Sequence, residues 1–378
     1  MGNSMKINAS GAAGEKLSAR AVNRATLARQ LLLERAALPV VDAVEHLLGL
    51  QAQTTHTWYV GLWSRLAGLD PVAVGTLLES RELVRIPVMR ATIHLLSAAD
   101  ALALRPVVQP MIDRAAMSTF GRHLGGVDRD ALVDAAREIT GERPRSAAEL
   151  GRLLAYRFPG RDAAGLAQVA RAWLPMVQVP PRGVWGRSGQ ALQSPLESWL
   201  GRAQRPLPLE RLVLRHLAAF GPATVRDVQT WSGLTRLAEV FTALRPGLRV
   251  FTGPDGAELF DLPDAPRPGP DSPAPVRFLY DFDNLLLSYA DRSRILGRPG
   301  DVDYTAHGYA IGSNQPATVL VDGMAAATWT VLHRRGSATL AVRAFRPLTP
   351  AEQAEIETEG AALLTFLHPG AAPDIRIG

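Results

Sequence analysis

The order of expected elements repeats three times over the first 262 residues, and this repetition constrains the fold more than any other feature. In each copy, residues with helical spacing precede two short β-type runs joined by a turn. Helices followed by a β-hairpin are typical of a winged helix. We therefore predict three tandem winged-helix domains, which span residues 17–97, 98–205 and 206–262.

The rest of the chain differs from these repeats. Residues 1–16, rich in Gly, Ala, Ser and Asn, are expected to be a disordered arm or a tag remnant. Residues 263–275 are rich in Pro, Asp and Gly and predict a linker. Residues 276–378 hold short β-type runs, a hairpin signal at Asp322-Gly323 and a final helix. We expect a small antiparallel β-barrel there, so that the fold class is mainly α with β-hairpins (α+β).

Two local expectations concern the second repeat. Its first part predicts separate helices at residues 98–104 and 108–120. Residues 177–187 predict a hairpin with Pro181-Arg182-Gly183 at its tip.

The second repeat also carries a local excess of positive charge. Between residues 140 and 205 there are ten arginines and four acidic residues, a local net charge of about +6 that exceeds the +5 of the whole chain. This region is the clearest electrostatic signal for a polyanion partner.

Residues 48–53 place Gln51 and Gln53 directly after an apolar helix. Gly49 is a favourable helix stop. If the chain then runs extended, both glutamines point to one side, because strand side chains alternate. Two neutral amides directed at one point can hold a water or a base edge, since each offers donors and an acceptor. Spacing alone favours the alternative, a helix cap followed by two solvated polar residues.

Three runs resemble the winged-helix DNA glycosylases of the AlkZ type: Leu48-Gly49-Leu50-Gln51-Ala52-Gln53, Arg90-Ala91-Thr92-Ile93-His94-Leu95, and Asp281-Phe282-Asp283-Asn284-Leu285-Leu286-Leu287-Ser288-Tyr289-Ala290-Asp291-Arg292-Ser293-Arg294. The resemblance covers roughly residues 17 to 368. It implies tandem winged helices, a C-terminal β-barrel, excision of bulky N-alkylated purines and unhooking of interstrand crosslinks, as in azinomycin resistance. The catalytic Gln-apolar-Gln motif of the family is matched by Gln51 and Gln53. The sequence departs from a sister subgroup with Asp at the second position.

The chemistry of two glutamines restricts the substrate. A neutral amide is not a general base, but it can orient a water and present its carbonyl dipole to a developing oxocarbenium ion. This modest catalysis suffices when the leaving group is already activated, as a cationic N7- or N3-alkylpurine is. Lysine occurs only at Lys6 and Lys16, and 39 of the 41 basic residues are Arg. A lyase needs an amine for a Schiff base, so a monofunctional glycosylase is expected.

Arginine richness has two interpretations. GC-rich coding would favour Arg without any functional meaning, whereas a pI near 9.9 suits a DNA partner. Candidate DNA contacts lie on the first two hairpins: Arg85, Arg90, Thr92, His94, Arg182 and Arg187. For His94 the alternative is a strand-end histidine bonded to backbone. Asp281 and Asp283 admit a paired-carboxylate interpretation. However, Asp281, Asp283 and Asp291 lie beside Arg292 and Arg294 in the sequence, which favours intramolecular ion pairs between the barrel and the winged helices.

These observations predict a monofunctional DNA glycosylase for alkylated and crosslinked purines. The expected partner is double-stranded DNA carrying such lesions. The chain lacks cysteine and any two-histidine metal spacing, and no apolar run is long enough to span a bilayer, so no cofactor, metal or membrane partner is expected. A monomer in the bacterial cytoplasm, nucleoid-associated when bound to DNA, is expected. The alternatives are a non-catalytic winged-helix DNA-binding protein, such as a transcription regulator, and a protein that sequesters a drug or adduct.

Overall fold

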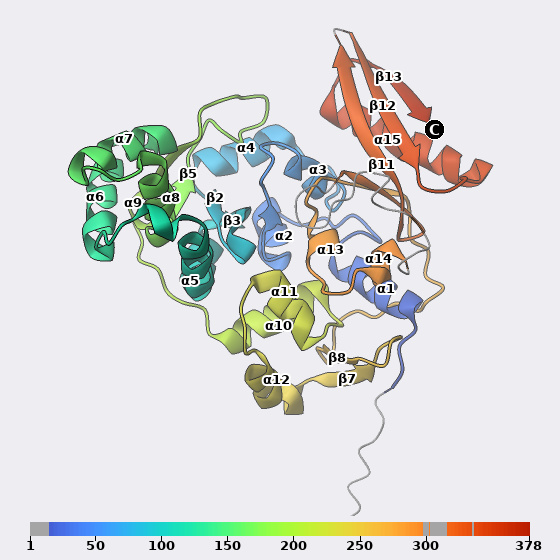
Figure 1. Cartoon of the computed structure of the whole chain (residues 1–378). Coiled ribbons are helices and arrows are strands. Elements are labelled where there is room, and N and C mark those ends of the chain that lie inside the picture. Colours follow the sequence, from blue (N-terminus) through green and yellow to red (C-terminus); the bar gives the residue numbers. More distant parts are fainter. Residues whose placement is uncertain (1–14, 298–301, 303–315, 335) are drawn as a thin grey trace, which may run out of the picture.

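A computed structural model gives the structure of residues 15–297, 302, 316–334 and 336–378. The predicted arm at residues 1–16 lies outside the described residues except for Glu15 and Lys16, which run beside the third unit. The first unit lies near the centre of the view in Figure 1, with the green second unit on one side and the yellow third unit below it. Its elements are α1 (Ala19–Arg29), α2 (Val40–His46), β1 (Leu50–Gln51), α3 (Trp58–Trp63), α4 (Pro71–Glu79), β2 (Leu83–Pro87) and β3 (Ile93–Ser97).

The second unit begins with one long helix where two were expected. Its elements are α5 (Ala98–Phe120), α6 (Arg129–Glu142), β4 (Arg145–Ser146), α7 (Ala147–Arg157), α8 (Ala163–Trp173), β5 (Met176–Gln178), β6 (Leu192–Pro195) and α9 (Leu196–Leu200). Pro106 lies inside α5 and cannot donate to the carbonyl of Leu102. The backbone N–H of Arg205 donates to that carbonyl instead, at 3.1 Å. A distant segment thus satisfies the oxygen that the proline leaves free, and the helix continues.

The expected hairpin over residues 177–187 is wrong in its second strand. The partner of β5 is β6, and the register pairs Val177 with Ser194. Pro180 and Pro181 follow β5 directly and carry no N–H, so they cannot extend a ladder. Residues 179–191 instead form a long connection that packs against the first unit, where the Tyr59 hydroxyl donates to the Gly183 carbonyl at 3.0 Å.

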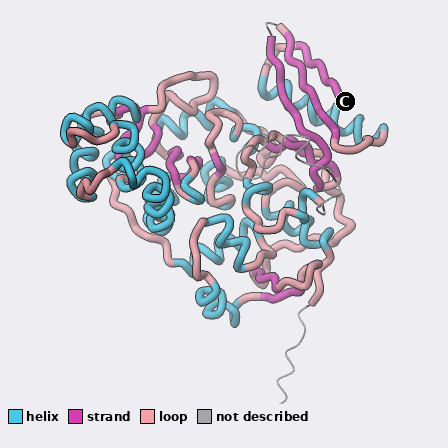
Figure 2. The backbone as a smooth tube through the Cα atoms, in the orientation of Figure 1, coloured by secondary structure: helices cyan, strands magenta, loops and turns pink. Residues whose placement is uncertain are grey.

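The first two units share one sheet. Its six strands follow the order β1-β3-β2-β5-β6-β4, and β2 meets β5 through the pair Arg85 and Gln178. The magenta strands of this sheet lie between the helices of both units in Figure 2. The mixed helix and strand composition is confirmed, whereas separate tandem winged helices are not, because the hairpins of the first two units merge into one sheet.

The third unit follows the predicted order of elements. It contains α10 (Leu209–Phe220), α11 (Val225–Ser232), α12 (Ala238–Leu244), β7 (Arg249–Thr252) and β8 (Glu258–Asp261). Thr224 caps α11 through a capping box with Asp227. A fully buried ion pair joins this unit to α1, since Arg29 donates to both carboxylate oxygens of Asp261 at 2.6 and 2.7 Å.

The C-terminal part forms an open sheet rather than the expected barrel. Its elements are β9 (Arg277–Leu279), α13 (Asn284–Leu287), α14 (Ser293–Leu296), β10 (Thr318–Val321), β11 (Met324–Arg334), β12 (Ser337–Ala344), α15 (Pro350–Leu367) and β13 (Ala372–Ile377). The order β13-β12-β11-β10-β9 leaves β13 and β9 as edges, so the described strands do not close a barrel. The hairpin at Asp322-Gly323 and the terminal helix are confirmed. Strand β13 was not predicted, and it runs parallel to β12.

One hydrophobic core joins this sheet to the first unit. Trp58 and Leu62 of α3 belong to the same buried cluster as Phe278 of β9 and Trp329 of β11. The contact is close at Gly61, where an added Cβ would lie 2.6 Å from the Tyr280 ring. The segment after β9 is therefore fixed against the unit that carries the glutamines.

Candidate functional site

The turn before the glutamines is built by a glycine. Helix α2 ends where the Gly49 N–H donates to the Val44 carbonyl at 2.8 Å, as the sequence predicts for a helix stop. Gly49 has a φ of +88°, and a Cβ there would lie 2.7 Å from the Leu95 carbonyl oxygen. This position therefore requires glycine. Asn284 of the C-terminal part donates to the Gly49 carbonyl at 2.6 Å, which fixes the point from which β1 leaves.

Gln51 is buried on the hairpin side of β1. Leu50 and Ala52 both belong to the central core, so strand alternation directs Gln51 to the opposite side. Gln51 pairs with His94 along the backbone and is 4% exposed. Its Oε1 accepts a hydrogen bond of 2.8 Å from the Arg90 guanidinium. The carbonyl end of the amide is therefore fixed toward Arg90.

Gln53 occupies a different environment. It lies beyond the end of β1 and is exposed. Its Oε1 accepts from the Ile93 N–H at 3.3 Å, and the neighbouring Ala52 N–H donates to the Ile93 carbonyl at 2.7 Å. Both glutamines thus contact the β2–β3 hairpin, one from inside and one at the surface.

The hairpin connection has an unusual backbone. Arg90 and Ala91 both have positive φ, 55° and 59°, which is uncommon for residues other than glycine. Arg90 also donates to the Trp231 carbonyl of α11 at 2.6 Å, so the third unit helps to hold the hairpin. Burial lowers the pKa of Arg90 to about 10, which leaves it charged at neutral pH. Thr92 ends the connection and donates to the Met89 carbonyl at 3.0 Å.

Arg85 and His94 lie in the interior beside the glutamines. The Arg85 guanidinium donates to the Ala52 carbonyl at 2.8 Å, and its burial lowers the pKa to about 10. His94 bonds through Nδ1 to the Thr92 carbonyl at 2.9 Å, which is the backbone-bonded alternative considered from the sequence. Burial lowers the pKa of His94 to about 3, so its ring is neutral. These placements favour support of the glutamine strand over a direct contact with phosphate.

Arg182 and Arg187 lie in the long β5–β6 connection. Arg182 donates to the Gly189 carbonyl at 3.1 Å. Arg187 is exposed and forms an ion pair with Glu79 of α4. The pairing offsets part of the positive charge that the sequence placed here.

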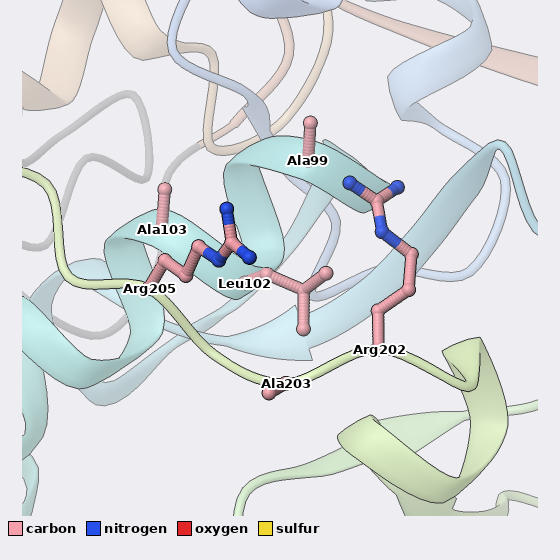
Figure 3. Close-up of a pocket in the computed structure, with 6 residues that line it drawn as sticks. All are labelled: Ala99, Leu102, Ala103, Arg202, Ala203 and Arg205. Atoms are coloured by element: carbon pink, nitrogen blue, oxygen red, sulfur yellow. The ribbon is translucent and has the colours of Figure 1, made fainter.

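The basic segment between residues 140 and 205 is also partly neutralised. Arg143 and Arg145 share Glu149, and Arg157 pairs with Glu138. Two arginines that the sequence did not single out, Arg202 and Arg205, have no acidic partner among the described residues. They line a hollow of about 380 Å³ beside the first turns of α5, where both guanidinium groups extend from the α9–α10 connection (Figure 3). Only the local net charge indicated them.

The two aspartates considered as a pair have separate roles. Asp283 is fully buried and receives two hydrogen bonds from Arg65, at 2.7 and 2.9 Å. The expected ion pair between the C-terminal part and the helical units is thus confirmed for Asp283, although its partner is Arg65. Arg294 instead approaches Asp227 of α11 at 3.6 Å. Asp281 binds the Thr54 hydroxyl, directly beyond Gln53.

In the part of the chain that the structure describes, no three His, Asp or Glu side chains are grouped so that they could hold a metal ion. None of the described helices is both long and apolar enough to cross a membrane.

The chain is similar to known proteins in its family and in its fold. The family model of the AlkZ-like DNA glycosylases matches residues 44–366. The solved structure of the Streptomyces sahachiroi DNA glycosylase AlkZ is similar, with a TM-score of 0.76 and 21% sequence identity, and the match covers 96% of this chain and 100% of that chain. At this identity the likeness shows a common fold in a distant relative. A search of curated proteins finds no match.

Proposed function

The chain belongs to the AlkZ-like DNA glycosylase family, and from this premise we propose that it hydrolyses the N-glycosidic bond of bulky N7- or N3-alkylated purines. Family membership makes it a DNA glycosylase with DNA as its partner. We extend this to the unhooking of interstrand crosslinks, and to resistance against a DNA-alkylating natural product of the azinomycin kind. We further propose that it acts as a monomer in the bacterial cytoplasm and associates with the nucleoid when bound to DNA.

The observation that carries the proposal is the fixed pair Gln51 and Gln53. Arg90 holds the carbonyl of the Gln51 amide, and the Ile93 N–H holds that of Gln53. Such preorganised amides can orient a water and stabilise developing positive charge on the sugar. An alkylated purine is already cationic, so it leaves as a neutral base without protonation. The pair therefore suits cationic lesions better than neutral damaged bases.

The DNA surface is proposed to be built from the three units over residues 17–97, 98–205 and 206–262, the ranges that the sequence predicts as winged helices. Arg90 and Thr92 lie at the hairpin beside the glutamines, and Arg182 and Arg187 lie on the β5–β6 connection. Exposed arginines can bind phosphate bidentately, so we propose Arg202 and Arg205 as further contacts to the DNA phosphate backbone. Arg85 and His94 are proposed to hold the strand in place from the interior.

We propose that a crosslinked base is reached without complete extrusion from the helix, because extrusion would have to displace both strands. A complex with an extruded base enclosed in a deep pocket would refute this.

We also propose that the protein has no lyase activity, because the chain has only two lysines that could form a Schiff base. Lys16 pairs with β7 of the third unit, and Lys6 lies outside the described residues. Borohydride trapping of a DNA adduct would contradict it.

The test is a substrate panel for the unaltered protein. Duplexes should carry N7-methylguanine, a crosslink between two N7-alkylguanines, uracil or hypoxanthine. We expect base release from the first two and none from the neutral bases. Release of uracil at a comparable rate would contradict the preference for cationic lesions. Binding of every duplex without release of any base would leave a non-catalytic DNA-binding protein.

A further inference from the structure

Asp281 contacts the chain directly after the two glutamines. One carboxylate oxygen, Oδ2, accepts a hydrogen bond from the hydroxyl of Thr54, the residue after Gln53. Asp281 comes from the segment after β9, whereas Thr54 belongs to the first unit. Within the described residues, this is the hydrogen bond that brings an acidic side chain next to Gln53.

The second oxygen of this carboxylate has no hydrogen-bond partner in the described part of the chain. Asp281 Oδ1 is buried without a hydrogen bond, and so is the hydroxyl of the adjacent Tyr280, a residue only 1% exposed. Buried polar atoms are nearly always paired, so each exception needs an explanation. Asp283, two residues further on, is paired at both oxygens. Within this short segment, both oxygens of Asp283 are used in an ion pair, whereas Asp281 keeps one oxygen that can still accept a hydrogen bond.

The buried Tyr280 phenol is influenced electrostatically by charged groups on both sides of the site. Burial is the main cause that raises the pKa of Tyr280 well above its usual value, so the phenol stays protonated. Asp281 and Arg90 both act on this phenol electrostatically, with opposite signs. Arg90 holds Gln51 and Asp281 binds Thr54, so the charges of two groups beside the glutamines act on the same buried phenol.

The backbone next to Asp281 has the same left-handed conformation as the β2–β3 connection. Phe282 has a φ of 61°, which is exceptional for a bulky side chain. Arg90 and Ala91 show the same left-handed conformation. Strain of about 1–3 kcal/mol at such a residue persists where the surrounding structure imposes it, and it concentrates at functional sites.

We propose that Asp281 is the carboxylate of the glycosylase site and takes the proton from the water that the glutamines orient. The proposal rests on the proposed function. Water adds to C1′ of the deoxyribose while the C1′–N bond breaks, and the bonding electron pair neutralises the departing cationic purine. The proton released by the water passes to Oδ1 of Asp281. Gln51 and Gln53 cannot accept that proton, because an amide is not basic.

Asp281→Asn is the direct test, because it keeps the shape and the Thr54 contact and removes the charge. Asp291→Asn is the matched control. Asp291 lies in the same segment, is exposed, and binds only Ser293 in the described structure. Both variants lose one negative charge, so their nonspecific attraction to DNA changes alike. The readouts are the single-turnover rate of N7-methylguanine release and the affinity for the damaged duplex.

We expect Asp281→Asn to slow release about 100-fold, the lower part of the range for a general base, with DNA affinity unchanged or higher. Asp291→Asn should release base at the unaltered rate. Added formate should restore release to Asp281→Ala, an effect that a purely structural role would not produce. If Asp281→Asn fails to fold, Thr54→Val is tested in its place, because it removes the hydroxyl that holds Asp281. Slower base release by this variant supports the proposal.

Release by a folded Asp281→Asn within twofold of the unaltered rate would overturn the proposal. A folded Thr54→Val with the unaltered rate, in the case that Asp281→Asn does not fold, would do the same. These results would leave the glycosylase function intact. Absence of release from the unaltered protein would instead refute the proposed function itself.

Discussion

Replacing Arg90 by methionine tests whether the hydrogen bond that fixes Gln51 contributes to base release. Methionine retains the apolar stem and removes the guanidinium, which donates to Gln51 Oε1 at 2.8 Å and to the Trp231 carbonyl at 2.6 Å. A hydrogen bond to a charged group contributes about 1.5–3 kcal/mol. If the whole contribution of the Gln51 bond acts in the transition state, the rate falls about 10- to 150-fold.

Arg105 provides the matched control, because its environment repeats that of Arg90 away from the glutamines. Its guanidinium donates to Oε1 of Gln109 within α5 and to the Ala172 carbonyl of α8, the latter at 2.7 Å. Burial lowers its pKa to about 10, as it does for Arg90. Arg105→Met therefore removes an equivalent buried guanidinium, with a similar expected loss of thermal stability.

The assay is single-turnover release of N7-methylguanine with enzyme in excess, at a temperature where melting curves show both variants folded. Arg90→Met should be slow, and Arg105→Met should release base at nearly the unaltered rate. Equal rates for the two variants would refute the reasoning, because the Gln51 bond would then contribute only to stability.

Three further predictions concern stability. Arg65→Met should lower the free energy of unfolding, measured in urea, by about 3–5 kcal/mol, because it leaves the buried Asp283 carboxylate unpaired. The double variant with Asp283→Asn should recover part of this stability. A double variant no more stable than Arg65→Met would contradict this. Burial lowers the pKa of His216 to about 3, so the folded state binds fewer protons than the unfolded state between about pH 3 and 6.5 and loses stability as pH falls. Because phenylalanine does not titrate, His216→Phe should reduce the fall in the free energy of unfolding between pH 7 and 5 by about 2 kcal/mol. An unchanged pH dependence of the urea midpoint would contradict this. Gly49→Ala should lower the free energy of unfolding by about 1–3 kcal/mol through backbone strain and should also slow base release. Asn284→Ala, which removes the hydrogen bond to the Gly49 carbonyl, should mainly lower the melting temperature. An unaltered melting temperature for either variant would contradict the turn described here.

Local sequence signals predicted the parts of the fold that depend on short-range physics. Gly49 ends helix α2 as expected, and Thr224, a residue type favoured at helix N-termini, begins α11. The strands of the third unit and the Asp322-Gly323 hairpin also follow from adjacent residues. These features need no knowledge of distant contacts.

The remaining features depend on residues far apart in the sequence. Pro106 stays inside α5 because Arg205 supplies the missing donor. Asp283 pairs with Arg65, 218 positions earlier, and not with Arg292 or Arg294, which lie within about a dozen residues of it. The burial of His94 could not be read from its spacing to Thr92, since spacing gives the face of a strand and not what covers it. Similarly, the orphaned oxygen of Asp281 is visible only in three dimensions.

The measurement that tests the central claim most directly compares base release and DNA binding in Gln51→Ala, Gln53→Ala and the unaltered protein. The substrates are an N7-methylguanine duplex and a crosslinked duplex. We predict that release collapses in both variants while binding to damaged DNA persists. Release at the unaltered rate from either variant would contradict a role for that glutamine in catalysis and would assign it to the turn that follows α2.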